Sequence, residues 1–294
     1  MTQNKINIIG VESCAGARDQ RCNRGPKKIR KLGIERVLSD KSQQTSWTSL
    51  FPSNQSTSNS AINSIDTIEY LCRELANHTQ YSMRQNEKFL VLGGDHSCAI
   101  GTWSGVLNAL NNDQNLGLIW IDAHLDSHLP ETSPSGAIHG MPIASLLGHG
   151  DKRLRDIANR PNRIKPKDLR IIGARSFEEG ETSLLEILDV NITDINAVNQ
   201  RGLHRVIEES IEYMRNTTSY YGISIDLDAI DPVDAPGVGS PAKNGLNADD
   251  LASVLTLAKH DNKFVGLEIT ELNPALDIDE KTAKLAITLA QTVF

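Results

Sequence analysis

Three short segments in the middle of the chain contain the residue types that bind metal ions. The first is GGDHS at 93–97, where two glycines let the chain turn sharply after an apolar run and put His96 at its end. The second is DAHLD at 122–126, and the third begins with SIDLD at 224–228. All three follow apolar runs, and binding sites in open α/β sheets lie at the carboxyl ends of strands.

The second and third segments are expected to put several carboxylates on one face. Alternate residues of an extended chain project to the same side, so Asp122, His124 and Asp126 should point together. Asp226 and Asp228 share a face for the same reason. Buried carboxylates that lie this close repel one another and need a cation as compensation. The spacing therefore predicts a metal site.

Together the three segments offer imidazoles and carboxylates but no thiolate. The predicted metal ligands are His96, Asp122, His124, Asp126, Asp226 and Asp228. This set is larger than a tetrahedral zinc site uses, and its oxygen-rich chemistry suits Mn²⁺. Two such ions about 3.5–4 Å apart can share a water and lower its pKa until hydroxide forms near neutral pH. The set therefore predicts a metal-dependent hydrolase.

The segments that must position these residues alternate between short apolar runs and longer amphipathic stretches. Short runs rich in Ile, Val and Leu are typical of strands buried on both faces of a parallel sheet. The predicted strands are Ile6–Ile9, Phe89–Leu92, Leu116–Ile121, Leu169–Ile172, Tyr221–Leu227 and Phe264–Ile269. Helical spacing predicts helices over Ile65–Ala76, Ala248–Ala258 and Thr282–Ala290, with Asn247 as an N-cap. This alternation predicts an α/β fold with a mainly parallel sheet.

Length and composition exclude several classes of protein. The chain has 294 residues and a formal net charge of −7, which argues against a general nucleic-acid-binding surface. No apolar run is long enough for a membrane-spanning helix or a signal peptide, so the cytoplasm is the expected location. Cys14, Cys22, Cys72 and Cys98 form no CxxC pair and are expected to be reduced thiols.

Residues 41–60 differ in composition from the rest of the chain, because Ser, Thr, Asn and Gln dominate them. Such a segment buries too little apolar area to order itself, so a surface loop or insertion is predicted. The alternative, a substrate lid or an oligomer contact, is favoured only by Trp47, Leu50 and Phe51. No repeat or Pro-rich linker divides the chain, so residues 1–294 are predicted to form a single domain.

These motifs resemble those of the ureohydrolase family, which includes arginase, agmatinase, guanidinobutyrase and formiminoglutamase. The resemblance rests on GGDHS at 93–97, DAHLD at 122–126, SGAIHG at 135–140 and SIDLDAIDPVDAPGVGSPAKNGL at 224–246, and it covers most of the chain outside residues 35–85. It implies a three-layer αβα fold, a binuclear Mn²⁺ site and a homo-trimer or homo-hexamer. The reaction that it implies is attack of a bridging hydroxide on a guanidino or formimino carbon.

The resemblance also implies a role for each site residue. One ion would be held by His96, Asp122, Asp126 and Asp226, and the other by His124, Asp122, Asp226 and Asp228. His139 matches the family's proton shuttle, a task that suits an imidazole with a pKa of about 6.5. Glu271 matches the glutamate that pairs with the substrate guanidinium. Asp126 completes the predicted catalytic set.

Five further residues are predicted to bind the rest of the substrate. Ser133 and Ser135 match hydroxyls that bind an α-carboxylate in arginases, which favours arginine over agmatine. His128 stands where arginases usually have asparagine, and it can still donate a hydrogen bond. Glu178 could replace the aspartate that meets the α-amino group, and Glu181 is a second acid beside it.

The favoured reaction is therefore hydrolysis of L-arginine to L-ornithine and urea. The alternatives are another guanidino acid, such as 4-guanidinobutyrate or a hydroxylated arginine, agmatine and formiminoglutamate. Arg175-Ser176 is closer to the agmatinase and guanidinobutyrase pattern. A different class is a non-catalytic pseudoenzyme that binds metal but releases no urea. The expected partners are a small guanidino substrate and further copies of the chain, with neither nucleic acid nor membrane.

Overall fold

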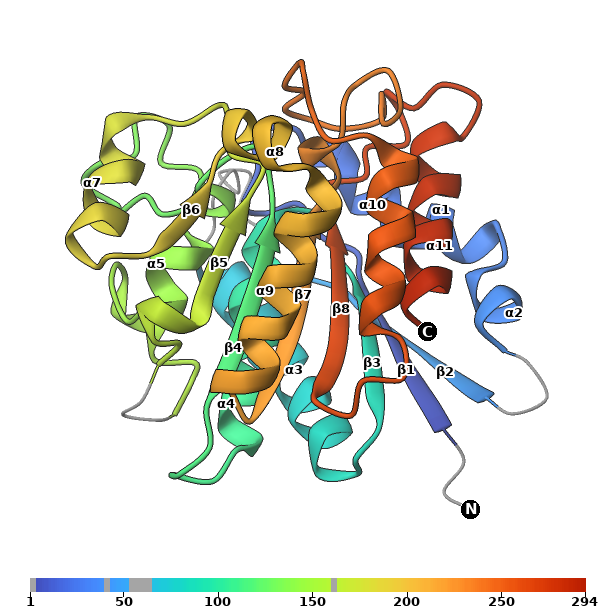
Figure 1. Cartoon of the computed structure of the whole chain (residues 1–294). Helices are drawn as coiled ribbons and strands as arrows, with labels where there is room; N and C mark the ends of the chain where they lie inside the picture. Colours follow the sequence, from blue (N-terminus) through green and yellow to red (C-terminus); the bar gives the residue numbers. More distant parts are fainter. Residues whose placement is uncertain (1–3, 40–42, 53–64, 160–162) are drawn as a thin grey trace.

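One central sheet organises the computed structural model, which describes residues 4–39, 43–52, 65–159 and 163–294 (Figure 1). Its strands are β1 (Asn4–Val11), β2 (Gln43–Leu50), β3 (Lys88–Leu92), β4 (Leu116–Ile121), β5 (Leu169–Ile172), β6 (Asn191–Thr193), β7 (Tyr220–Asp226) and β8 (Phe264–Thr270). They lie in the order β2-β1-β3-β8-β7-β4-β5-β6. Every pairing is parallel, so the carboxyl ends of all the strands share one edge.

Helices cover both faces of this sheet. They are α1 (Gly25–Lys31), α2 (Ile34–Leu38), α3 (Ile65–Arg84), α4 (Ala99–Ala109), α5 (Pro142–Leu146), α6 (Lys152–Arg155), α7 (Glu179–Ile187), α8 (Ile195–Arg201), α9 (Leu203–Thr217), α10 (Ala248–Leu255) and α11 (Lys281–Val293). One core cluster joins the sheet to α1, α2 and α8–α11, and a second joins it to α3–α5 and α7. The three-layer αβα prediction is confirmed (Figure 1).

The predicted elements match the observed ones closely where the pattern is apolar. All six predicted strands are present, and Leu116–Ile121 and Leu169–Ile172 have the predicted bounds. Asn247 caps α10, since its side chain accepts a hydrogen bond from the backbone N–H of Asp250. The helix predicted over Ile65–Ala76 continues to Arg84. Thr79 and Ser82 are buried and extend the face of the helix that packs against the core.

The prediction of a surface loop over residues 41–60 is wrong for Gln43–Leu50, which form the edge strand β2. β2 pairs with β1 residue for residue, from Asn4 opposite Gln43 to Val11 opposite Leu50. The ladder uses backbone groups, so polar side chains can occupy an edge strand. Trp47 also has the Arg30 guanidinium 4.7 Å from its ring centroid. Residues 40–42 and 53–60 lie outside the described part.

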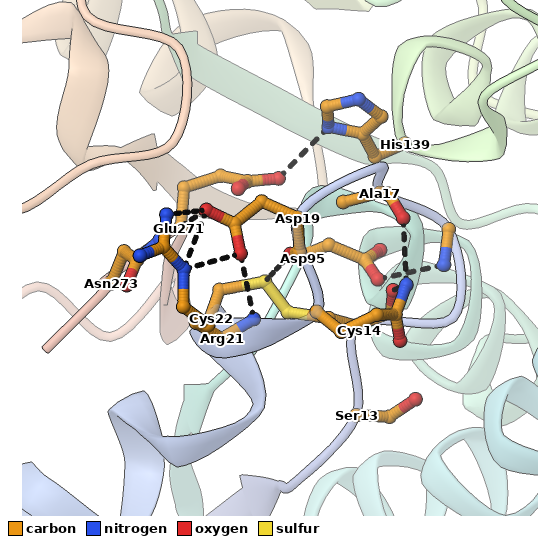
Figure 2. Close-up of a disulfide and its surroundings, with 12 residues drawn as sticks. Ser13, Cys14, Ala17, Asp19, Arg21, Cys22, Asp95, His139, Glu271 and Asn273 are labelled. Carbon is orange, nitrogen blue, oxygen red and sulfur yellow. Dashed lines mark hydrogen bonds and ion pairs between the residues drawn. A yellow bond between two sulfur atoms is a disulfide. The ribbon is translucent and has the colours of Figure 1, made fainter. Parts of the chain in front are cut away.

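The prediction that all four cysteines are reduced is wrong for Cys14 and Cys22, which form a disulfide (Figure 2). Their Cα atoms lie 5.9 Å apart, within the usual range for a bridge. The chain turns back between them, and the backbone N–H of Ala17 donates to the Cys14 carbonyl at 3.2 Å. Cys72 and Cys98 are free, as predicted, and both are buried.

Two further predictions concern the chain as a whole. Within the described ranges, none of the helices has both the length and the apolar character that crossing a bilayer requires. Strands from the beginning and the end of the chain lie beside one another in one sheet, with β3 next to β8. This arrangement supports a single domain, which stays a prediction.

Gly94 is expected to tolerate no side chain, because the chain that leaves β3 passes against neighbouring backbone there. A Cβ at Gly94 would lie 1.8 Å from the Ser13 carbonyl oxygen. We expect Gly94→Ala to lower the free energy of unfolding by at least about 1–3 kcal/mol, read from the urea midpoint. Gly140→Ala is the control, since its Cβ would lie 3.7 Å from the nearest atom. Equal midpoints for the two variants would contradict this expectation.

Candidate functional site

His96 lies completely buried at the carboxyl end of β3, stacked on the Trp120 ring. Its Nε2 is 2.9 Å from the Ser224 hydroxyl, which donates to Glu268 at 2.7 Å. Thr102 and Trp103 also donate to Glu268, so this buried carboxylate is well satisfied. Because the Ser224 proton goes to Glu268, His96 Nε2 donates to Ser224. The lone pair is then on Nδ1, the atom that faces the aspartates.

Three aspartates surround His96 Nδ1. Asp122 Oδ2, Asp126 Oδ2 and Asp226 Oδ2 each lie 3.2 Å from it. Nδ1 is nevertheless buried without a hydrogen bond from any described residue. Burial opposes a charge on His96, but the three carboxylates close to it raise its pKa well above the usual range. Burial and the Asp122 charge raise the pKa of Asp126 to about 7. A bound cation could replace the protons that this cluster otherwise takes up.

A second histidine stands on the other side of Asp122. His124 Nδ1 lies 3.2 Å from Asp228 Oδ2 and 3.5 Å from Asp122 Oδ1. Two groups that could each hold a metal ion therefore share one carboxylate. Their members are His96, Asp122 and Asp226 in the first group, and Asp122, His124 and Asp228 in the second. Asp122 is fixed from two sides, by the Trp120 indole N–H and by the backbone N–H of His124.

The backbone that brings these side chains together is not the predicted extended strand. β4 ends at Ile121, and the DAHLD segment follows as a loop in which Asp126 has a φ of 45°. Asp228 lies in a 3-10 turn (η5, Leu227–Ala229) after β7, where its backbone N–H donates to the Asp226 side chain. The aspartates converge through turns at the ends of two neighbouring strands, so strand alternation was the wrong reason for their convergence.

A cleft of about 440 Å³ opens over this cluster. Its lining includes the predicted site residues His124, Asp126, His128, Ser133, Ser135, His139, Glu178, Glu181, Asp226 and Asp228. His96 and Asp122 do not line it, because both are completely buried. Arg18 and Ser240 also line this cleft and an adjoining cavity of about 310 Å³, which Glu271 lines as well. The sequence motifs pointed to neither Arg18 nor Ser240.

His139 and Glu271 form a pair beside the cleft (Figure 2). His139 Nδ1 lies 3.1 Å from Glu271 Oε1, which also accepts the backbone N–H of His96 at 2.9 Å. Burial works against protonation of His139, but the Glu271 carboxylate raises the pKa of this imidazole to about 9. Both hydrogen bonds use Oε1, so Glu271 can offer Oε2 to a ligand.

His128 connects two walls of the cleft. Its Nδ1 lies 3.1 Å from the Thr132 hydroxyl, and its Nε2 lies 3.2 Å from Glu178 Oε2. Glu178 and Glu181 cap the start of α7 reciprocally, which orders both acids. Burial raises the pKa of Glu181, whereas the side chain of Glu178 is 57% exposed. This wall of the cleft is therefore rich in acceptors.

Another part of the cleft lining has hydroxyl groups. Ser133 Oγ accepts the backbone N–H of Gly136 at 3.0 Å, and Ser135 Oγ accepts that of Ala137 at 3.1 Å. The two hydroxyl oxygens also lie 3.4 Å apart, so one hydroxyl can donate to the other while the second donates to an anion in the cleft. The lining of the cleft thus includes hydroxyl donors as well as carboxylates.

Arg175, whose motif differs from that of arginases, does not line the cleft. Its guanidinium donates to the carbonyl oxygens of Asp228 at 2.8 Å and Ala242 at 2.9 Å. Arg175 therefore links the turn that contains the candidate ligand Asp228 to the loop that precedes Asn244. Asn244 has a φ of 60°, in the left-handed region that asparagine tolerates better than most residues.

Comparison with known proteins gives a consistent result. Residues 4–294 match the family model described as the arginase family, including the stretch 35–85 that the motifs left out. A curated arginase from Bacillus caldovelox is 34% identical, with 98% of this chain and 97% of that protein covered. A crystal structure of arginase from Bacillus subtilis has a TM-score of 0.91 and 33% identity, with 99% and 98% covered. The Entamoeba histolytica arginase in complex with L-ornithine has a TM-score of 0.89 and 30% identity, with 100% and 98% covered.

Proposed function

This chain belongs to the arginase family, and we propose that it hydrolyses L-arginine to L-ornithine and urea. One observation above all supports the proposal: two His/Asp groups share Asp122 beneath a cleft whose lining includes hydroxyl donors and carboxylates. L-arginine has the complementary groups. Its α-carboxylate needs hydrogen-bond donors, its α-ammonium needs acceptors, and its guanidinium pairs with a carboxylate.

The residues at the base of the cleft fit two divalent cations. His96 Nδ1 is buried without a hydrogen bond and lies next to three carboxylates, which is the environment expected of a metal ligand atom. The proposed ligands of one ion are His96, Asp122 and Asp226 together with Asp126, which lies 3.2 Å from His96. Those of the other are His124, Asp122 and Asp228, to which the family resemblance adds Asp226. Their oxygen-rich chemistry favours Mn²⁺. Two such ions would lower the pKa of a shared water, so that hydroxide is available near neutral pH.

The cleft residues would bind the two ends of the substrate. Ser133 and Ser135 donate to the α-carboxylate, while Glu178 and Glu181 accept from the α-ammonium. His128 orients Glu178 through their 3.2 Å contact and adds a donor to this wall. These contacts hold the guanidinium toward the aspartates on the floor.

His139 and Glu271 would act on the guanidinium end. Glu271 Oε2 accepts from the guanidinium, while Oε1 stays on His139 and on the backbone of His96. His139 is protonated at neutral pH, because Glu271 raises its pKa to about 9 although burial opposes this. It lines the cleft and can therefore give a proton to the amino group that leaves.

A substrate comparison tests the proposal. The Mn²⁺-loaded protein is assayed for urea from L-arginine, agmatine and 4-guanidinobutyrate, and for formamide from formiminoglutamate. We expect the highest kcat/KM for L-arginine, because agmatine lacks the carboxylate and 4-guanidinobutyrate lacks the ammonium. Urea from agmatine alone would contradict the proposal. No product from any compound would favour the non-catalytic alternative.

Ser224 is expected to position His96 for metal binding. It links His96 Nε2 to Glu268, and removing such a partner typically weakens metal affinity about 10- to 100-fold. We expect Ser224→Ala to raise the Kd for Mn²⁺ by about tenfold, measured by competition with a chelating dye. Ser210→Ala is the control, a buried serine that donates to Val206 in α9. Equal affinities in the two variants would rule out this role of Ser224.

We also propose that the protein works in the cytoplasm as a homo-trimer or homo-hexamer. The family resemblance supports the assembly, and Ile187, Val233 and Ile278 are exposed apolar side chains that contacts between copies could cover. Light scattering would report the mass directly. A monomer at micromolar concentration would contradict the assembly.

A further inference from the structure

Arg18 stands out by its charge among the residues of the cleft. The described lining includes five acidic side chains, and Arg18 is its one arginine or lysine. It lines both the cleft and the adjoining cavity, as Ser135 does. Among the described side chains of the lining, Arg18 is therefore the one that offers a permanent positive charge to an anionic group in the cleft.

The loop that presents Arg18 is closed by the disulfide between Cys14 and Cys22 (Figure 2). Gly16, at its start, donates its backbone N–H to Asp95 Oδ2 at 2.8 Å and accepts the backbone N–H of His139 at 3.2 Å. Inside the loop, the Gln20 side chain donates to the carbonyls of Cys14 and Ala17. Hydrogen bonds therefore join the loop to Asp95 and His139, and further hydrogen bonds within the loop stabilise it.

The residue after Arg18 is held as well. Asp19 accepts three hydrogen bonds from the Arg21 guanidinium and one from the Asn273 side chain at 3.0 Å (Figure 2). The bonding to Arg21 lowers the pKa of Asp19 to about 2, so it stays charged in this contact. Ala17, on the other side, is buried. The backbone of Arg18 is therefore fixed while its exposed side chain reaches into the cleft.

We propose that Arg18 is a specificity-determining residue that binds the carboxylate of the substrate, and that the Cys14–Cys22 disulfide holds it in place. This inference rests on the proposed function, because it assigns the cation that recognises one end of L-arginine. A guanidinium can donate two parallel hydrogen bonds to a carboxylate. Ser135 lines the same two cavities as Arg18, so its hydroxyl is available as a further donor.

The role of the disulfide makes specificity sensitive to redox state. Reduction breaks the bond between the two sulfur atoms, and a dithiol such as dithiothreitol supplies two electrons and two protons while becoming a cyclic disulfide. The products are the thiols of Cys14 and Cys22. Without the bridge, residues 15–21 keep the hydrogen bonds of Gly16, Asp19 and Gln20 but lose their covalent constraint, so Arg18 is held less firmly at the cleft.

Steady-state kinetics of Arg18→Met test the role of the side chain. We expect the KM for L-arginine to rise at least about fivefold with kcat within about twofold, since a charged hydrogen bond outside the reacting centre is lost. The KM for agmatine should not change, because agmatine has no carboxylate. Arg84→Met is the matched control, an exposed arginine at the end of α3 that lines neither cavity. An unchanged KM for L-arginine in Arg18→Met overturns the proposal.

The double variant Cys14→Ser with Cys22→Ser, and the wild type in dithiothreitol, test the disulfide. Both should raise the KM for L-arginine about two- to fivefold, and adding Arg18→Met should then have less than its full effect. A full effect of Arg18→Met in the double variant overturns the role of the disulfide.

Calorimetric binding of L-ornithine and putrescine separates this inference from the proposed function. Arg18→Met should weaken L-ornithine binding at least about fivefold and leave putrescine binding unchanged. No urea from L-arginine in the wild type would refute the proposed function, while L-ornithine binding would still test Arg18. Equal L-ornithine affinities in wild type and variant overturn the inference.

Discussion

Replacing Asp122 with asparagine is expected to lower urea production from L-arginine by at least about 10³-fold. Asp122 belongs to both candidate ligand groups, and its two oxygens face His96 and His124. Asparagine keeps the size of the side chain but removes the charge that both ions would share. Losing about 4 kcal/mol of electrostatic stabilisation corresponds to this factor. Metal analysis after gel filtration should also show less Mn²⁺ per chain.

A matched variant separates this effect from a general cost of changing a buried carboxylate. Asp168 is completely buried before β5, where it accepts a hydrogen bond from Asn115, and it does not line the cleft. Asp168→Asn should keep the Mn²⁺ content and keep kcat within about twofold. Full activity together with full metal content in Asp122→Asn would refute the metal assignment.

The second large effect is expected at His139. His139→Asn should lower kcat about 10²- to 10⁴-fold, the usual contribution of a general acid, with Mn²⁺ content unchanged. In the wild type, His139 is charged below its pKa of about 9, which hydrogen bonding to Glu271 raises although burial works against it. Asp95 and Asp126 also face it and act in the same direction as Glu271. The wild-type kcat should therefore fall as the pH rises through about 9.

The pH profile of the variant adds a second readout. His139→Asn should lack the decline near pH 9, because the group that titrates there is gone. His204→Asn is the control, an exposed histidine on α9 that should leave both kcat and the profile unchanged. A kcat within twofold of the wild type in His139→Asn would show that the proton comes from elsewhere.

The fold could be predicted wherever it depends on apolar runs. β4 and β5 are apolar stretches buried on both faces, and their bounds follow from the sequence directly. β2 could not be predicted, because it is an edge strand of Gln, Thr and Ser whose order comes from pairing with β1. β6 is a three-residue strand, too short for any periodicity to show.

The candidate site, like the fold, could be predicted from the sequence only in part. The ligand set could be predicted because two imidazoles and four aspartates gather in three motifs, each at the end of an apolar run, and buried carboxylates in such numbers need cations. The backbone conformation that aligns these ligands could not be predicted, since Asp126 and Asp228 lie in turns that the strand pattern does not show. The pairing of Cys14 with Cys22 depends on a loop path, so no local spacing rule predicts it, and the position of Arg18 depends on the same path.

Titration of the metal-free protein with Mn²⁺, with urea release from L-arginine followed at each step, tests the proposed binuclear chemistry most directly. We expect no urea without metal and activity that saturates at two Mn²⁺ per chain, since the groups around His96 and His124 must both be filled. Urea release at full rate from the metal-free protein would contradict this chemistry, as would Mn²⁺ binding at two per chain with no urea at any step.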